Sequence, residues 1–481
     1  MGECLRENAE NLGFVRRKPG LFPDVLYTDM EWLHCCAGNW CAAWADIHVP
    51  ENMQPGEYPL TVKLLYAMDY DGEILESREM TLTVTVAGAN LPAQKLIHTE
   101  WFHCDCLAQE YGMVPWSEPF WEVLANYFRD FTAHGINLLL TPLFTLPMDT
   151  AQGKERLTTQ LIGIKKCGSD YQFDFTRLKR WIDLAQECGI HLFEFSHLFS
   201  QGGAKYPTKI VAEVDGKEQI IFGWDKPAND PEFKRFLDIF LPLIAGKVRE
   251  WGMTDQVYFH VGDEPNDKVL DTYSYAAKIM QHHLKGFRIL DAASHVEFYE
   301  QGLLDLPVPM EMCLKNFLKF PLRERWTYYC GGPDLPYSNR LHTMPASANR
   351  IMGTLLYWYQ CDGFLHWGYN FWNSGRSLRP VNPLGAEPDF DYHPGDQFLV
   401  YPGKDGCPID SMHYEVFFHG LQDLRAYQKL ESLVGREQVL DLIRQVAGYD
   451  LEMNHFPLEE DFLLRLRARV NQEIHKAQAA L

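Results

Sequence analysis

The chain has 481 residues, of which 46% are hydrophobic and 14% aromatic, and its formal net charge at pH 7 is -21. This length predicts two or three domains and a large packed core. The negative charge argues against a nucleic-acid partner and against an anionic membrane surface, because both require a basic face on the protein. The 13 Trp and 23 Tyr suit a site that stacks on sugar rings.

The cysteines and the N-terminus indicate where the protein resides. The close pairs Cys35–Cys36 and Cys104–Cys106 lack a second pair at zinc-site spacing, and the 12 cysteines are otherwise scattered. This pattern predicts free thiols in a reducing compartment. The first residues lack the apolar core of a signal peptide, and no apolar run reaches the ~18 residues of a membrane helix. We therefore expect a cytoplasmic protein without membrane insertion; the sequence indicates no oligomeric state.

Residues 1–90 are expected to form a small β-sandwich-like domain. Residues 58–68 and 79–86 have the composition of strands, and Tyr70, Asp71 and Gly72 between them predict a hairpin turn. The segment is short for a complete sandwich, which favours a truncated domain. A linker follows over residues 88–94.

From residue 95 the pattern changes to short apolar strands that alternate with helices. The predicted strands are residues 96–101, 136–140, 190–195, 257–260, 287–291, 308–313, 326–330 and 364–367. Helical patterns occupy residues 119–134, 175–188, 231–251, 346–361 and 421–433. This alternation predicts an α/β fold with a (β/α)₈ TIM barrel over residues 95–435. Residues 436–481 are expected to be a helical extension that packs on the barrel.

The stretch of residues 257–265, VYFHVGDEP, carries the strongest functional signal. Its apolar strand stops at Gly262, and the acids Asp263 and Glu264 follow directly. Pro265 disfavours helical backbone at Glu264. A helix cap with a surface acid would be the ordinary explanation. Because active sites of barrel enzymes lie at the carboxyl ends of the strands, we predict instead that both acids are catalytic.

Other predicted strands also end in polar and aromatic residues. The candidate substrate-binding residues are His103, Asp105, His197, His260, Tyr328, Tyr329, Arg340, Trp367, Asn370 and Trp372. Aromatic walls combined with hydrogen-bonding groups and carboxylates are typical of a carbohydrate site. A divalent metal bound by His103, Asp105, His197 and His260 is the competing interpretation. No pair among them has the spacing of a known metal motif, so we favour a site without metal or cofactor.

The adjacency of the two acids bears on mechanism. An ordinary retaining glycosidase holds two carboxyl groups ~5–5.5 Å apart on opposite sides of the reacting carbon. Neighbouring residues have Cα atoms ~3.8 Å apart and side chains that diverge. Adjacent acids fit better where a 2-acetamido group of the substrate supplies the nucleophile. A distant Glu194 or Asp291 could still complete an ordinary pair.

Several motifs, in this order, carry a resemblance to a known family. They are residues 98–106 (HTEWFHCDC), 140–145 (LTPLFT), 194–201 (EFSHLFSQ), 259–265 (FHVGDEP), 328–330 (YYC), 338–340 (SNR), 363–371 (GFLHWGYNF) and 395–403 (GDQFLVYPG). Together they resemble glycoside hydrolase family 123, the β-N-acetylgalactosaminidases, and related uncharacterised bacterial proteins with the same catalytic domain. The resemblance extends from about residue 40 to the end.

The resemblance implies a β-sandwich followed by a (β/α)₈ barrel, and retention of configuration through substrate assistance. Asp263 would hold the acetamido N–H, and Glu264 would be the general acid/base. The implied substrate is a terminal β-linked N-acetylgalactosamine on a glycan or a glycolipid headgroup. Alternatives are another 2-acetamido sugar, such as a β-N-acetylglucosaminide, or a sugar-binding barrel without turnover. Gly262 stands where the family pattern leads us to expect a serine.

Overall fold

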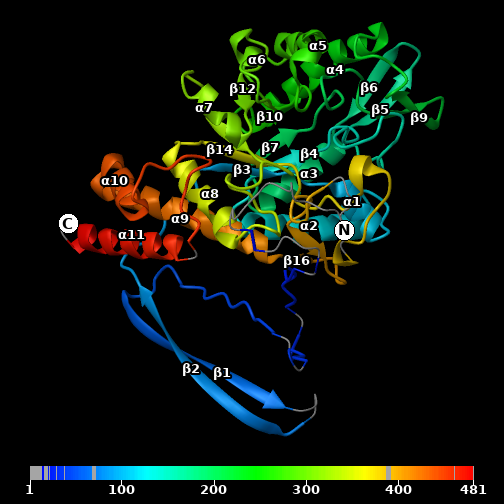
Figure 1. Ribbon diagram of the computed structural model, residues 1–481. Coiled ribbons are helices and arrows are strands. Elements are labelled where there is room, and N and C mark those ends of the chain that lie inside the picture. The colour runs from blue at the N-terminus through cyan, green and yellow to red at the C-terminus, as the bar shows by residue number, and fades with distance from the viewer. Residues whose placement is uncertain are drawn as a thin grey trace.

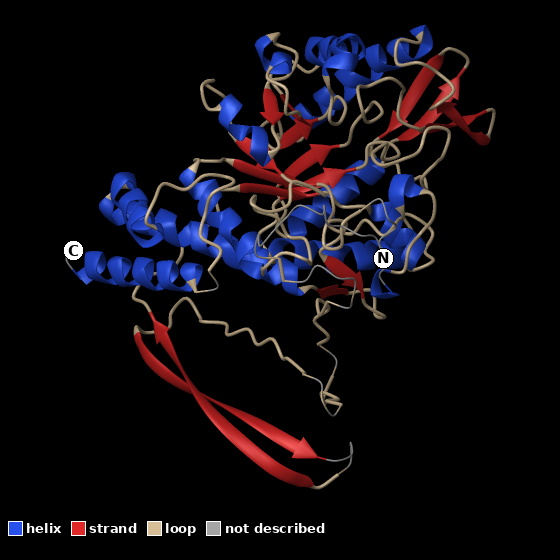
Figure 2. Cartoon of the chain, viewed as in Figure 1, coloured by secondary structure: helices blue, strands red, loops and turns tan. Residues whose placement is uncertain are grey.

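The computed structural model describes residues 14–15, 20, 22–28, 30–36, 38, 40–67, 72–385, 392–459 and 461–479. It has a mixed α/β fold with parallel strands at its centre and helices around them (Figures 1 and 2). None of the helices described is both long and apolar enough to cross a membrane.

Two parallel sheets form the centre of the fold. A five-stranded sheet has the order β12-β11-β10-β7-β4, and a three-stranded sheet has the order β13-β14-β3. The strands are β3 (Ile97–Glu100), β4 (Leu138–Thr141), β7 (Leu192–Phe195), β10 (Val257–Phe259), β11 (Arg288–Ala292), β12 (Leu306–Val308), β13 (Trp326–Tyr328) and β14 (Gly363–His366). The predicted parallel strands are therefore present in the predicted order, whereas a closed barrel remains a prediction.

One predicted strand is placed differently. The sequence favoured residues 308–313, but β12 ends at Val308, and Glu311–Cys313 form a 3₁₀ turn. Pro309 has no backbone N–H to donate to a neighbouring strand. The N–H of Cys313 donates to the carbonyl oxygen of Met310 at 2.7 Å and closes the turn instead.

Alternation along the strands separates two apolar layers. Leu138 and Leu140 on β4 belong to an inner cluster with Tyr258 of β10. Leu139 and Phe259 point the other way, into a larger cluster with the surrounding helices. A strand reverses its side-chain direction at each residue, so strands that are buried on both faces are apolar throughout.

Helices lie between and around the strands. They are α1 (Cys104–Glu110), α2 (Glu118–Ala133), α3 (Thr176–Glu187), α4 (Pro231–Glu250), α5 (Leu270–His283), α6 (Glu297–Glu300), α7 (Leu314–Phe317) and α8 (Ala346–Trp358). The local sequence explains the bounds of α4: the side chain of Asp230 accepts hydrogen bonds from the backbone N–H of Glu232 and Phe233, and Pro231 occupies the first turn. The 3₁₀ turns are η1 (Asp267–Val269), η2 (Glu311–Cys313), η3 (Gly375–Ser377) and η4 (Pro383–Gly385).

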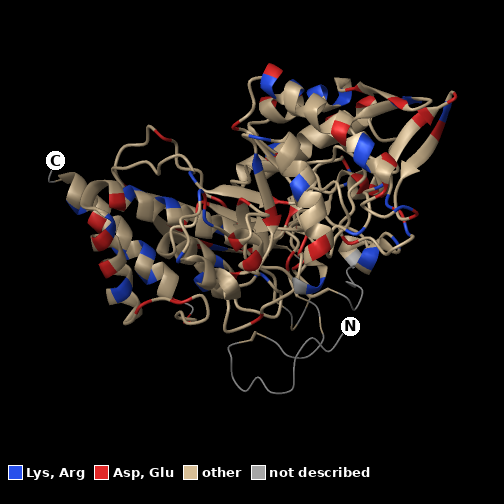
Figure 3. Cartoon of the chain, turned by 90° about the horizontal axis from the view of Figure 1, so that it is seen from above, with Lys and Arg blue, Asp and Glu red and all other residues tan. Residues whose placement is uncertain are grey.

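Ion pairs along the outer helices explain part of the charge pattern. In the view of Figure 3, acidic and basic residues are interspersed along these helices. Lys179 contacts Asp183 at 2.5 Å, and Lys234 contacts Asp238 at 2.6 Å, each one helical turn apart. Exposed pairs of this kind each contribute only about 0.3–0.5 kcal/mol to stability.

The connections contain strands that the sequence did not predict. β5 (Gly163–Cys167), β6 (Asp170–Asp174), β8 (Ile210–Val214) and β9 (Lys217–Phe222) form a four-stranded sheet in the order β6-β5-β8-β9. β15 (Val400–Pro402) pairs with β16 (Pro408–Asp410). These strands are short and partly polar, so their apolar pattern is weak.

The N-terminal segment contains one antiparallel hairpin in its described part. β1 (Gly56–Ala67) pairs with β2 (Ile74–Val86), with Leu60 opposite Leu82. Figure 1 shows this hairpin projecting from the body. The predicted sandwich is not confirmed, because the described residues before residue 90 form only this two-stranded sheet. The predicted turn residues Tyr70 and Asp71 lie outside the described residues.

The C-terminal region is helical. It comprises α9 (Met412–Val434), α10 (Arg436–Ala447) and α11 (Phe462–Ala479). Leu421 of α9, Ile443 of α10 and Leu466 of α11 share one apolar cluster with Met352 of α8. The apolar faces of these helices therefore pack on the helix that precedes β14.

Candidate active site

The loop after β10 is tied to the end of β11. Asp291 accepts hydrogen bonds from the backbone N–H of Val261 at 3.1 Å and of Gly262 at 3.2 Å. Glu264 has a positive φ of 45°, and its N–H donates to the carbonyl oxygen of Ala292 at 3.1 Å. A left-handed conformation at a residue other than glycine is strained, and such strain is concentrated at functional sites.

A cavity of about 250 Å³ lies beside this loop. Its lining includes both predicted catalytic acids and two predicted substrate-binding residues, Tyr328 and Trp367. The remaining lining residues are Trp101, Met148, Asp149, Gln201, Ala292, Cys330, Gly331, Leu365, Tyr392 and Asp396. The wall is thus aromatic and acidic, a composition that suits a carbohydrate site.

Asp263 is buried and held from one side. Nε2 of Gln201 donates a hydrogen bond of 2.9 Å to Oδ2 of Asp263, and Oε1 of Gln201 accepts from the backbone N–H of Asp149 at 2.9 Å. Burial raises the pKa of Asp263 well above its usual value, and the neighbouring Glu264 and Asp291 raise it further. His260 and the hydrogen bond from Gln201 oppose this increase.

Glu264 is exposed at the cavity, in contrast to its neighbour. The hydroxyl of Tyr328 donates a hydrogen bond of 2.7 Å to Oε1 of Glu264. Burial raises the pKa of Tyr328 well above its usual value, so the phenol keeps its proton and remains a donor at neutral pH. One oxygen of Glu264 is therefore oriented by Tyr328.

Two aromatic walls are anchored through their ring nitrogens. Nε1 of Trp101 donates to Oε1 of Glu194 at 2.8 Å, and Nε1 of Trp367 donates to Oδ2 of Asp396 at 3.1 Å. The ring centroid of Trp367 lies 5.1 Å from that of Tyr392. These contacts fix the planes against which a sugar ring could stack.

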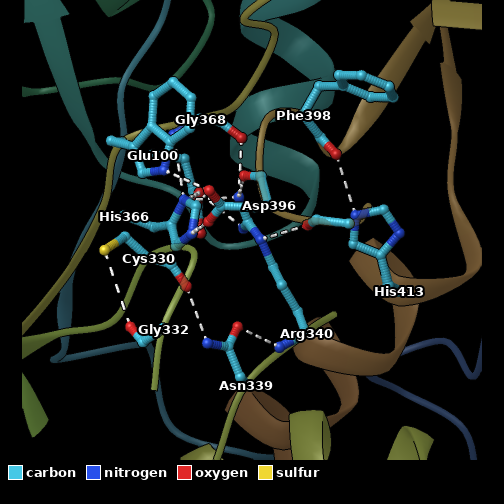
Figure 4. A network of polar contacts seen from close by, with 12 residues as sticks. Glu100, Cys330, Gly332, Asn339, Arg340, His366, Gly368, Asp396, Phe398 and His413 are labelled. Carbon is cyan, nitrogen blue, oxygen red and sulfur yellow. Dashed lines mark hydrogen bonds and ion pairs between the residues drawn. The ribbon is translucent and has the colours of Figure 1, made fainter. Parts of the chain in front are cut away.

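A third carboxyl group, Asp396, belongs to the network in Figure 4. Its Oδ1 lies 3.1 Å from Nε2 of His366, and Nδ1 of His366 accepts from Nη2 of Arg340 at 2.6 Å. Nη1 of Arg340 donates to Oε2 of Glu100 at 2.9 Å. Burial raises the pKa of Asp396 to about 7, although Arg340 opposes this increase. The cavity therefore contains a carboxyl group that titrates near neutral pH.

His103, Asp105 and Asn370 lie outside the cavity lining, in a buried cluster. Arg156 donates to Oδ1 of Asp105 at 2.6 Å, to Oδ2 at 2.7 Å and to Nδ1 of His103 at 3.0 Å. The side-chain oxygen of Asn370 accepts from the backbone N–H of His103 at 2.7 Å. These side chains hold the loop after β3 behind Trp367, whose carbonyl oxygen lies 2.8 Å from Nε2 of His103.

The other predicted substrate-binding residues are also buried away from the cavity lining. Trp372 donates through Nε1 to the carbonyl oxygen of Val400 at 3.2 Å, and Tyr329 packs against His366. His197 and His260 stack with ring centroids 4.0 Å apart. Arg340 contacts the cavity residue Asp396 both through His366 and directly, because its Nη2 donates to the backbone carbonyl oxygen of Asp396 at 3.1 Å.

Within the described residues, several groups bring three possible metal ligands within 4.8 Å of one another. They are Asp24, His342 and His413; His197, His260 and Asp291; Asp46, Glu415 and His419; and Asp130, His134 and Asp410. The group nearest the acids contains His197 and His260, whose rings are inclined by only 26° and stacked. Lone pairs in the planes of two stacked rings do not converge on one ion, so this geometry does not favour a metal there.

Sequence reasoning missed Gln201 and Asp396 as site residues. Both lie in the motifs that carry the family resemblance, but neither directly follows a predicted strand. Only the connections after β7 and β14, which fold back over the strand ends, bring them to the cavity.

The comparisons with known proteins address the family and the fold of the chain. The sequence pattern of "Glycoside hydrolase 123, catalytic domain" matches residues 101–430. The chain belongs to glycoside hydrolase family 123. The resemblance described from its motifs is thereby confirmed, and membership of this family supports a glycosidase that acts on a carbohydrate substrate.

Solved structures extend the comparison. A family 123 glycoside hydrolase from Clostridium perfringens, studied for glycolipid glycan hydrolysis, has a TM-score of 0.66 at 15% identity, covering 90% of this chain and 77% of that one. This similarity shows the shared fold. A family 5 mannosidase from Rhizomucor miehei has a TM-score of only 0.34 at 12% identity, covering 72% of this chain and 95% of that one. The search of curated proteins gave no match.

Proposed function

We propose that this family 123 member is a retaining glycosidase that releases terminal β-linked N-acetylgalactosamine by substrate-assisted catalysis. The observation that carries the proposal is the unequal setting of the adjacent acids. Asp263 is buried and bonded to Gln201, whereas Glu264 is exposed and bonded to Tyr328. Two carboxyl groups in different environments suit two different roles.

Asp263 has the role of orienting the acetamido group. Its Oδ2 is occupied by Gln201, which leaves Oδ1 to accept the acetamido N–H. That hydrogen bond turns the acetamido carbonyl oxygen toward the anomeric carbon. Attack by this oxygen forms an oxazolinium ion, expels the leaving group and replaces the enzyme nucleophile of ordinary retaining enzymes.

Glu264 has the role of general acid and then of general base. As an acid it protonates the glycosidic oxygen of the leaving group. As a carboxylate it then removes a proton from the water that attacks the anomeric carbon and opens the oxazolinium ring. Tyr328, which bonds to Oε1, leaves Oε2 available for both proton transfers.

The cavity supports a small sugar as the occupant. Its volume of about 250 Å³ lies just below the range of about 300–1,000 Å³ typical of sites for drug-sized ligands. Trp101, Trp367 and Tyr392 supply the aromatic faces, and Asp396 supplies a hydrogen-bonding group. We assign the cavity to the single terminal sugar, with the remainder of a glycan or glycolipid headgroup outside it.

The same proposal includes a closed (β/α)₈ barrel as the scaffold. Both seams between the two parallel sheets carry backbone hydrogen bonds. At one seam, the N–H of Asn137, just before β4, donates to the carbonyl oxygen of His98 on β3 at 3.0 Å. At the other seam, the N–H of Tyr328 on β13 donates to the carbonyl oxygen of Pro309, just after β12, at 3.1 Å. A barrel would place every strand end at one face, around the cavity.

The deciding experiment measures nitrophenol release from an aryl β-N-acetylgalactosaminide and from its β-N-acetylglucosaminide counterpart. We expect turnover of the first substrate and its loss in Glu264→Gln when the leaving group is poor. Equal turnover of an aryl β-galactoside, which lacks the 2-acetamido group, would contradict substrate assistance. Turnover of the glucosaminide alone would reassign the sugar but not the mechanism.

A further inference from the structure

His260 lies directly behind the catalytic loop, between two carboxyl groups. Its Nε2 lies 2.5 Å from Oε1 of Glu194, and its Nδ1 lies 2.9 Å from Oδ1 of Asp291. All three side chains are fully buried. A neutral imidazole has one N–H and one lone pair, whereas an ionised carboxylate only accepts hydrogen bonds. Both contacts are therefore satisfied together when both nitrogens carry a proton.

Further contacts favour this charged form. Burial alone would lower the pKa of His260, but Glu194 and Asp291 outweigh it and raise the pKa to about 9. The ring stacks on His197, whose pKa is held well below its usual value by burial and by His260. Neither ring nitrogen of His197 has a hydrogen-bond partner in the described part of the chain. His197 thus offers the π face of a neutral ring to the imidazolium.

The two partners of His260 connect it to the cavity on both sides. Asp291 holds the backbone N–H of Val261 and Gly262, directly before Asp263. Glu194 accepts from Nε1 of Trp101, which is part of the cavity wall. One cation thus anchors both the catalytic loop and an aromatic wall.

The geometry points to His260 as a positioning residue, a buried imidazolium that fixes the loop of Asp263 and opposes protonation of that carboxyl group. This inference rests on the proposed role of Asp263 as the acceptor for the acetamido N–H. The titratable groups that face His260 are Glu194 on β7, His197 after it, Asp291 on β11 and Asp263 on its own loop. Without the cation, Asp263 would face only like charges.

The test is the pH profile of kcat/KM for His260→Gln on the aryl β-N-acetylgalactosaminide. We expect the acidic limb to move to higher pH by about one unit, so that kcat/KM on that limb falls about tenfold, because loss of a nearby cation favours protonated Asp263. The double variant His260→Gln/Glu194→Gln removes one charge of each sign. Its acidic limb should return toward that of the wild type, a response that a purely structural role would not produce.

His134→Gln is the matched control. His134 also lies between two carboxyl groups, with Nδ1 3.2 Å from Asp130 and Nε2 3.2 Å from Glu415, but it is not among the residues that line the cavity. The acidic limb of the pH profile of His134→Gln should stay where it is in the wild type. An unmoved limb in His260→Gln would overturn the inference. Full activity in Asp263→Asn would instead overturn the proposed function, so the two failures are distinct.

A spectroscopic measurement keeps the inference testable if His260→Gln does not fold. His134 would give a similar signal, because its carboxyl partners raise its pKa to about 11 despite its burial, and the variant His134→Gln removes that signal. In ¹⁵N-histidine NMR of His134→Gln at pH 8, we expect a slowly exchanging ring with both nitrogens protonated, which Glu194→Gln should weaken. Absence of that signal would show that His260 is neutral and would overturn the inference.

Discussion

Gln201 connects two walls of the cavity through the two ends of one amide: Nε2 donates to Oδ2 of Asp263 and Oε1 accepts from the backbone N–H of Asp149, both at 2.9 Å. The backbone donor at Asp149 determines which way the amide faces, so the NH₂ group must face Asp263. The carboxyl group of Asp263 is therefore oriented before any substrate enters.

Replacing Gln201 should impair catalysis more than it impairs folding. Gln201→Ala frees the carboxyl group of Asp263, and we expect kcat/KM to fall about 10- to 100-fold, since small misplacements of a catalytic group are costly. Gln201→Glu should be worse, because it places a like charge beside Asp263. Gln219→Ala, on the exposed part of β9, is the control. Unchanged kinetics in Gln201→Ala would show that Asp263 needs no such support.

Glu264→Gln should separate substrates by their leaving groups. Without a general acid, alkyl glycosides lose turnover almost entirely, whereas aryl glycosides with acidic phenols retain part of the first step. The ratio of kcat/KM for a dinitrophenyl and a methyl glycoside measures this effect. The same ratio in the variant and the wild type would contradict the role of Glu264 as an acid.

Tyr328→Phe should reduce kcat/KM about tenfold and leave folding largely intact, because one charge-assisted hydrogen bond contributes about 1.5–3 kcal/mol. The change removes the hydrogen bond of 2.7 Å to Oε1 of Glu264 but keeps the aromatic ring in the cavity wall. If only KM changed, Tyr328 would act on binding of the substrate and not on Glu264.

Asp263→Asn should lose activity and gain stability at neutral pH. The pKa of Asp263 is raised in the folded state, so the unfolded chain loses this proton first as the pH increases, and folding stability then falls. The asparagine side chain of the variant carries no charge and avoids this loss. Urea unfolding at pH 7 should show the variant more stable, with the difference vanishing at about pH 3, below the ordinary pKa of Asp of about 3.9.

A thiazoline analogue of the oxazolinium ion should inhibit the wild-type enzyme competitively. It should bind Asp263→Asn at least about tenfold more weakly, because the hydrogen bond to the ring nitrogen becomes weaker when the acceptor is neutral. Isothermal titration gives both affinities. Equal binding by the two proteins would exclude Asp263 as the acetamido-orienting residue.

The sequence by itself determined the parallel strands, their order and the adjacent acids after β10. These features depend on local patterns: apolar runs of strand length, glycines after helices, and polar residues where a strand stops. The position of Asp263 and Glu264 at the end of β10 follows from the local pattern, whereas Asp291 and Gln201 hold the loop and the Asp263 carboxyl group in place.

Only the tertiary structure decided which other polar residues face the cavity. His103 and Asp105 also follow a strand, but Arg156, which is distant in the sequence, turns them into a buried ion-pair cluster. Gln201 and Asp396 reach the cavity from long connections that carry no strand pattern. A buried charge takes whichever partner the fold brings within hydrogen-bonding distance, and sequence spacing does not encode that distance.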